Sequence, residues 1–134
     1  MIIRTLVMAS VMVFAGSASA ALKGDIANGK KLFESKGNKN SAGQPIAQCT
    51  SCHGVGNTGK TPDGAAMPAE NPILAGQYPD YLTKALTDYK TKKRAHLGMQ
   101  NNASALTPQQ IADITSYLGS LKSNVHDLSK HENE

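Results

Sequence analysis

The sequence has few of the residues that usually build a large core or a catalytic site. It contains no tryptophan, two phenylalanines and four tyrosines in 134 residues, so side chains alone supply a thin hydrophobic core. The only two cysteines, Cys49 and Cys52, cannot make a four-ligand structural zinc site by themselves. Basic residues are not interleaved with aromatic ones, which argues against nucleic-acid binding. No nucleophile beside a base and no carboxylate pair at working spacing is recognisable, so we expect no enzyme active site.

Long hydrophobic segments are also absent. The apolar run from Leu6 to Gly16 has only 11 residues, which is too short to cross a bilayer core of ~30 Å as a helix. It follows Arg4 and precedes Ala18-Ser19-Ala20, which is the pattern of a secretory signal peptide and its cleavage site. We therefore predict a cleaved signal peptide over residues 1–20 and no permanent membrane anchor. The remaining 114 residues are enough for one domain.

The most informative segment is Cys49-Thr50-Ser51-Cys52-His53, because C-x-x-C-H is the attachment signature of a c-type haem. The two thiols have the spacing to join the vinyl groups of one haem, and the histidine can reach its iron. A thioredoxin-like redox pair, half of a zinc site or a simple disulfide would also contain C-x-x-C. A redox pair belongs beside a βαβ pattern, which is missing here, and the other three histidines lie more than forty residues away. Haem is therefore the favoured interpretation.

Three segments of the chain carry helix signals. Asp25 can cap a first helix that ends at Gly37, and Pro79 suits the first position of a second helix. Thr107-Pro108-Gln109-Gln110 predicts a third helix, because it combines an N-cap hydroxyl, a proline at N1 and a glutamine able to close a capping box. The faces with helical spacing are, in order, Ile26, Gly29, Lys30 and Phe33; Leu82, Ala85, Leu86 and Tyr89; and Ile111, Ile114, Leu118, Leu121 and Val125.

Irregular segments connect these helices. Residues 37–48 and 54–72 are rich in polar residues, glycine and proline, which is much loop for so small a domain. Loops folded around a bound cofactor would explain them, whereas disorder is the alternative for residues 37–48. We expect residues 126–134 to fray, because they have no apolar pattern.

This order of elements resembles the small single-haem class I cytochromes c of bacteria, particularly one half of the dihaem cytochromes of denitrifying bacteria. The likeness runs from Gly29-x-x-x-Phe33 through CTSCH and NPILAGQYPDYL to LTPQQIADITSYL. It implies an all-α class I cytochrome c fold over residues 21–125, with three main helices and long loops around one haem bound covalently through Cys49 and Cys52. It also implies that the first and last helices cross closely, with Gly29 and Phe33 against Tyr117.

The resemblance further implies the iron ligands. His53 would be the proximal ligand, and Met99 has the family's distal position, seven residues before the leucine that precedes the last capping motif. A thioether is a soft, neutral ligand, so a His/Met pair gives a closed six-coordinate site of relatively high potential. Met67 and His96 are the alternative distal ligands. The backbone carbonyl of Pro72, in the family's Pro-x-Leu-x-Gly turn, is expected to accept a hydrogen bond from His53.

The densest basic group lies between the second helix and Met99. It is either a solvated helix end, where cations complement the helix dipole, or a docking surface that steers an acidic redox partner. Its members are Lys84, Lys90, Lys92, Lys93 and Arg94.

These features predict a periplasmic electron carrier that shuttles one electron between periplasmic or membrane-bound redox proteins, as a monomer or weak dimer. One alternative is the haem-bearing subunit of a periplasmic oxidoreductase complex. Another is a haem sensor or enzyme with five-coordinate iron, which would require that Met99 does not bind.

Overall fold

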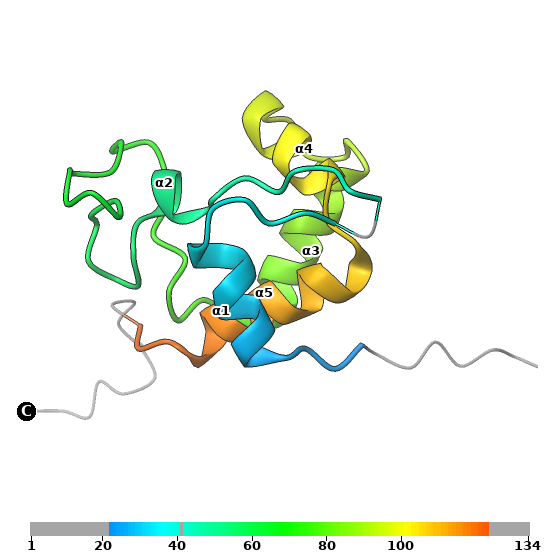
Figure 1. Cartoon of the computed structure of the whole chain (residues 1–134), viewed down its shortest axis with the longest axis horizontal. Coiled ribbons are helices and arrows are strands. Elements are labelled where there is room, and N and C mark those ends of the chain that lie inside the picture. The colour runs from blue at the N-terminus through cyan, green and yellow to red at the C-terminus, as the bar shows by residue number, and fades with distance from the viewer. Residues whose placement is uncertain (1–21, 41, 124–134) are drawn as a thin grey trace, which may run out of the picture.

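The computed structural model describes residues 22–40 and 42–123, and within these ranges it contains five helices and no strand (Figure 1). The helices are α1 (Ile26–Glu34), α2 (Thr50–His53), α3 (Pro79–Lys90), α4 (Leu97–Ser104) and α5 (Pro108–Ser120). The all-α prediction is confirmed. The predicted signal peptide at 1–20 and the predicted tail at 126–134 lie outside the described residues.

The starts of the three predicted helices are confirmed. The Asp25 side chain accepts a hydrogen bond from the Asn28 backbone N–H and caps α1, α3 begins at Pro79, and Thr107 and Gln110 close a capping box on α5. The ends differ, since α1 stops at Glu34 and α5 stops at Ser120, while Val125 lies outside the described residues. None of the helices in the described part of the chain is long and apolar enough to cross a membrane.

Helices α1 and α5 cross at the centre of the molecule (Figure 1). A Cβ atom added at Gly29 would lie 2.0 Å from the carbonyl oxygen of Asp113 and 2.9 Å from the Cβ of Tyr117, so only glycine fits at this crossing. Beside it, the rings of Phe33 and Tyr117 pack at a tilt, with their centroids 6.1 Å apart. The predicted close crossing is therefore present.

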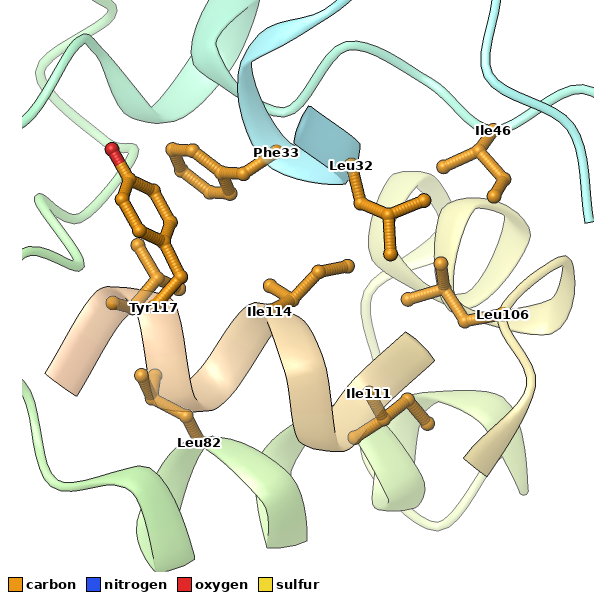
Figure 2. Packing of buried hydrophobic residues seen from close by; sticks show 9 residues of the cluster. Leu32, Phe33, Ile46, Leu82, Leu106, Ile111, Ile114 and Tyr117 are labelled. Carbon is orange, nitrogen blue, oxygen red and sulfur yellow. The ribbon is translucent and has the colours of Figure 1, made fainter. Parts of the chain in front are cut away.

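The hydrophobic core lies between these two helices and extends to α3 and to the segment before α5 (Figure 2). Ile46 is only 5% exposed and belongs to the core, so the segment 37–48 is packed rather than detached from the domain. Within that segment, Lys39 and Pro45 form an isolated bridge, and Asn38 donates its side-chain amide to three carbonyls at the end of α1. The buried cluster consists of Leu32, Phe33, Ile46, Leu82, Leu106, Ile111, Ile114, Tyr117 and Leu118.

Candidate haem site

The Cys-x-x-Cys-His motif forms a single helical turn. Helix α2 begins directly after Cys49, the His53 N–H donates to the Cys49 carbonyl over 3.0 Å, and Gly54 ends the turn with a φ of 75°. Because one turn brings residues three and four apart together, Cys49, Cys52 and His53 share one short and rigid element. This arrangement can present two sulfurs and one imidazole to the same ligand.

The turn is held against the end of α1 by a residue that the sequence analysis missed. Gln48 donates its side-chain amide to the Glu34 carbonyl over 2.7 Å, and its side-chain oxygen accepts a hydrogen bond from the Ser51 hydroxyl. The Cys49 N–H also donates to the Phe33 carbonyl over 3.1 Å. The partners in α1 lie 14 or more residues before Gln48 and Cys49, so no local pattern in the sequence could have revealed this role.

The imidazole of His53 is buried, with 8% of the residue exposed, and it is oriented by the chain itself. Its Nδ1 lies 2.8 Å from the backbone carbonyl oxygen of Pro72. A carbonyl oxygen can only accept, so Nδ1 carries the proton and Nε2 keeps its lone pair for a metal. The structure thus contains the contact that was expected between Pro72 and His53.

The turn that contains Pro72 is itself attached to the C-terminal end of α5. Gly76, with a φ of 74°, donates its N–H to the Leu118 carbonyl over 2.8 Å. A Cβ atom at Gly76 would lie 2.4 Å from the Cβ of Ser123, so the chain passes too closely for a side chain. His53 is therefore oriented by a backbone carbonyl that is itself anchored on the core.

The two cysteines do not have the properties of a redox pair or a metal site. Both are free thiols, and burial raises the pKa of Cys49 to about 11, whereas a catalytic redox cysteine has a lowered pKa. Among the described residues, no group of three or more histidine, cysteine and acidic side chains could hold a metal ion. A half-buried, unactivated cysteine three residues from a second cysteine is compatible with thioether attachment to a ligand.

Met99 lies in the first turn of α4 and is half-buried. The Nδ1 of His96 accepts a hydrogen bond from the Met99 N–H over 3.1 Å, so His96 acts as the N-cap of α4. The sulfur of Met67 lies next to Gly54, 3.2 Å from where a Cβ of that residue would be, in the loop that follows His53. The two alternative distal ligands therefore already have local structural contacts.

Exposed apolar side chains near the motif provide a test of whether a haem fits. Seven large hydrophobic residues are exposed in the described part of the chain, and five of them follow His53 or Pro72 within two residues or lie at the N-terminal end of α3 or α4. The hydroxyl of Thr50, inside the motif, is buried without a hydrogen-bond partner among the described residues. A large apolar ligand would cover such side chains, so the residues present fit a haem. The five are Val55, Ile73, Tyr78, Tyr81 and Leu97.

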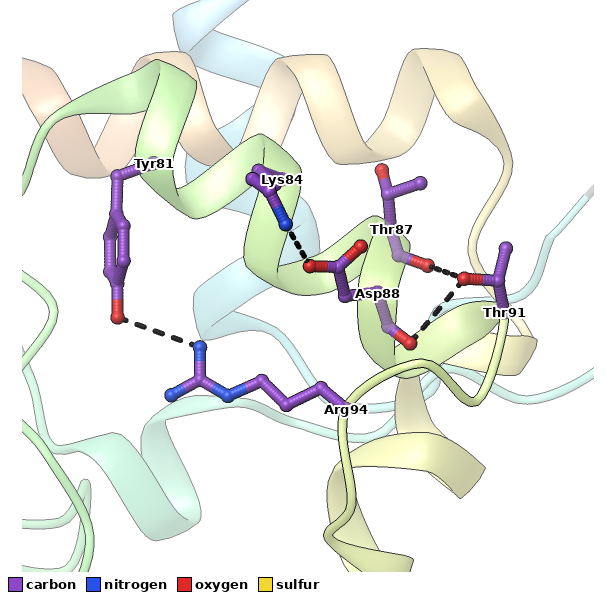
Figure 3. A network of polar contacts seen from close by, with 6 residues as sticks. All are labelled: Tyr81, Lys84, Thr87, Asp88, Thr91 and Arg94. Carbon is purple, nitrogen blue, oxygen red and sulfur yellow. Dashed lines mark hydrogen bonds and ion pairs between the residues drawn. The ribbon is translucent and has the colours of Figure 1, made fainter.

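The predicted basic group has members with and without side-chain partners, and Figure 3 shows two that have partners, Lys84 and Arg94. Lys84 forms an ion pair with Asp88, and the guanidinium carbon of Arg94 lies 5.0 Å from the centroid of the Tyr89 ring, which the cation faces. Lys90 donates to backbone carbonyls at the end of α4 and is therefore not a free docking charge. Lys92 and Lys93 are exposed, and we find no side-chain contact for either among the described residues.

Comparison with known proteins identifies the family. The cytochrome c family model matches residues 26–122. Cytochrome c4 of Azotobacter vinelandii is 36% identical over 97 residues, which cover 69% of this chain and 41% of that protein. The cytochrome c4 structure of Acidithiobacillus ferrooxidans has a TM-score of 0.57 at 30% identity, covering 77% of this chain and 54% of the other. The cytochrome subunit of sulfide dehydrogenase of Chlorobaculum tepidum is 31% identical over 78 residues, covering 58% of this chain and 64% of that protein.

The match extends over most of the described domain, although the chain spans less than half the length of the cytochrome c4 of Azotobacter vinelandii. The family carries covalently bound c-type haem, and the sequence contains a single C-x-x-C-H motif, so the cofactor predicted from Cys49 and Cys52 is confirmed. The chain therefore belongs to the cytochrome c family of electron-transfer proteins, as a single-haem domain similar to one half of a dihaem cytochrome c4.

Proposed function

We propose that this protein is a soluble one-electron carrier of the periplasm, with its haem iron ligated by His53 and Met99. The observation that carries the proposal is the 2.8 Å contact between His53 Nδ1 and the Pro72 carbonyl, which leaves Nε2 free to bind iron. The bound haem supplies an iron that alternates between the ferric and ferrous states. Cys49 and Cys52 tether it, and the anchored Pro72 turn keeps the imidazole in one orientation in both states.

Met99 is the distal ligand in this proposal because its rivals have other contacts. The Met67 sulfur lies beside Gly54, directly after the proximal histidine, and His96 uses its Nδ1 to cap α4. A methionine in the first turn of an otherwise polar helix has little core to fill, since Ala103 is the only buried residue of α4. A His/Met pair also suits a carrier, because a six-coordinate iron offers no open position for substrate.

The proposed location is the periplasm, which the predicted signal peptide at residues 1–20 would provide. Docking through Lys92 and Lys93 would attract an acidic partner, because these exposed charges have no ion-pair partner within residues 22–40 and 42–123. The charge reversal Lys93→Glu should slow electron exchange with anionic hexacyanoferrate and speed it with a cationic cobalt complex. Both effects should fade as ionic strength rises, and rates that do not depend on the charge of the reagent would exclude this docking role.

A second candidate function is that of a haem subunit in an oxidoreductase complex. The similarity to the cytochrome subunit of sulfide dehydrogenase favours it, because that relative is named as part of an enzyme. Gel filtration of native extract separates the two functions. Elution at the size of the free protein supports the carrier, whereas co-elution with a larger partner protein supports the subunit.

Optical spectra of the purified haem-loaded protein test the ligation. We expect a weak far-red sulfur-to-iron charge-transfer band in the ferric wild type and in Met67→Ala, and no such band in Met99→Ala. Loss of the band in Met67→Ala with retention in Met99→Ala would assign the ligand to Met67. A wild type without the band would exclude methionine ligation and redirect attention to His96 or to an open, ligand-binding iron.

A further inference from the structure

The C-terminal end of α4 receives hydrogen bonds from two distant parts of the chain. The Nζ of Lys90, in the last turn of α3, donates to the carbonyl oxygens of Ser104 and Leu106 over 3.0 and 2.7 Å. The side-chain amide of Asn40 donates to the carbonyl oxygen of the intervening Ala105 over 2.6 Å. The last carbonyls of a helix lack partners within it and form the negative end of its dipole, so a cation and an amide suit this place well.

Helix α4 packs along α3, but it buries few apolar side chains of its own. It has eight residues, and an isolated helix of this length is marginal in water. Ala103 is its only buried residue, so hydrophobic packing gives it a small anchor. Figure 1 shows α4 at the edge of the molecule, beyond the crossing of α1 and α5. The polar contacts at its C-terminal end therefore add to the packing along α3 and to the burial of Leu106, which follows the helix, in attaching α4.

The contacts at the two ends of α4 differ in kind. At the N-terminal end, His96 caps the Met99 N–H, and Gln100 donates its side-chain amide to the Arg94 carbonyl over 2.9 Å. These hydrogen-bond partners are at most six residues apart, and this end also contacts α3 through the His96 ring, which packs edge-on against Tyr89 with the ring centroids 6.3 Å apart. The donors at the C-terminal end belong to α3 and to the segment 37–48, 14 to 65 residues away. Those bonds help to attach the helix.

Asn40 is itself held in place for this task. Its side-chain oxygen accepts hydrogen bonds from the backbone N–H groups of Ala42 and Gln44 over 3.0 and 2.9 Å, while its amide also donates to the Gln44 side chain. Ile46, two residues after Gln44, is buried in the core. The loop thus presents a preorganised donor to α4, and less conformational freedom is lost when the bond to Ala105 forms.

We infer that Lys90 and Asn40 clamp the C-terminal end of α4 and are positioning residues that keep the Met99 sulfur in place for iron. This inference rests on the ligation proposed above. A clamp of this kind raises the free energy of the local opening that would move α4 and Met99 away from the iron. It therefore determines how easily another ligand replaces Met99. It gives Lys90 and the segment 37–48 a role in the site.

Imidazole binding to the ferric haem-loaded protein tests the clamp, with loss of the far-red band at pH 8 as the readout. Lys90→Ala should lower the apparent dissociation constant of imidazole about tenfold. The variant lacks the hydrogen bonds from a charged group that stabilise the closed state, so imidazole replaces Met99 more easily. The matched control is Lys93→Ala, which removes the same charge without removing a contact and should leave the constant within about twofold. Lys90→Arg should restore most of the wild-type value.

Two further measurements separate the clamp from the ligation and from general stability. In Asn40→Asp, which keeps the acceptor oxygen but replaces the donor, imidazole should again bind more tightly, and amide hydrogen exchange in α4 should accelerate relative to α5. Equal imidazole constants in Lys90→Ala, Asn40→Asp and wild type would overturn the positioning role while Met99 ligation stands. A wild type without the band would overturn both the ligation and the positioning role, and the exchange rates would then report only whether the clamp holds α4.

Discussion

Replacement of Gly29 by alanine should be among the most damaging single-methyl changes in this protein. The added Cβ would lie 2.0 Å from the Asp113 carbonyl oxygen and 2.5 Å from its carbon, and both atoms belong to the backbone of a buried helix. Contacts below 3.0 Å are essentially absent from real structures, so α1 and α5 must separate by about 1 Å at their crossing. No side chain can rotate away to relieve this overlap.

The cost follows from two opposing terms. Forcing extra atoms into a packed interior costs about 1–3 kcal/mol and sometimes more, and the tilted contact between Phe33 and Tyr117 would be strained as well. Against this, alanine gains about 1 kcal/mol over glycine in helix propensity. Because the new Cβ is fixed to one helix backbone and overlaps the backbone of the other, we expect the steric cost to lie near about 3 kcal/mol, the upper end of its range. After the gain in helix propensity, the net loss of stability is about 2 kcal/mol or more.

Thermal unfolding of the haem-loaded protein measures this loss. For a domain of about 100 residues, 2 kcal/mol corresponds to a fall in Tm of roughly 10 °C. The matched control is Gly98→Ala in α4, where the nearest atom is a His96 ring carbon at 3.4 Å, so the helix-propensity gain should leave Tm unchanged or raised. A Gly29→Ala protein that melts within 2 or 3 °C of the wild type, on the order of a 0.5 kcal/mol change, would refute the reasoning about the crossing.

Three further changes test other parts of the molecule. Burial raises the pKa of Asp113, but hydrogen bonds from Asp25, Gln109 and Asn28 outweigh it and hold the pKa below its usual value, so Asp113 stabilises the fold above about pH 4 and less as pH falls. Urea unfolding between pH 3 and 7 should show this loss in the wild type and a flatter profile in Asp113→Asn; parallel profiles would contradict it. Thr50→Val should leave Tm unchanged or raise it, since the buried hydroxyl has no partner among the described residues, and a loss above about 1 kcal/mol would reveal a bond to the cofactor. Pro72→Ala loosens the carbonyl that orients His53, lowers the basicity of the imidazole and should raise the reduction potential, whereas an unchanged potential in voltammetry would count against this role.

Sequence signals located those parts of the fold whose causes are local. Asp25, Pro79 and the Thr107 capping box act within one helical turn, and each marks the start of a helix in the structure. The crossing at Gly29 was predictable only through the family resemblance, because its partner Tyr117 lies 88 residues away in the chain. The predicted end of α1 is too late because it relies on Gly37 as the stop, and that of α5 because apolar spacing continues to Leu121, beyond its last helical residue, Ser120.

Helix α4 was missed for a physical reason. Its sequence, LGMQNNAS, has no apolar face, so the periodicity that reveals α1 and α5 is absent. The helix forms where Lys90 and Asn40 satisfy its terminal carbonyls, and such contacts exist only after distant segments have come together. For the same reason Lys90 was grouped with the surface charges, although its amine is bound to the backbone of α4.

The two proposed iron ligands are therefore held in different ways. His53 is oriented by a backbone carbonyl whose turn is anchored on α5 through Gly76, so moving the imidazole would disturb the core. Met99 lies on a short helix that buries one residue of its own and is attached by packing along α3 and by polar side chains at its C-terminal end. Local opening of a protein begins where few apolar contacts are broken, so opening of the site should begin with α4 while His53 stays in place. It follows that substitutions along α4 and its clamp should change ligand exchange at the iron with little effect on Tm, whereas substitutions at the crossing of α1 and α5 should change Tm first.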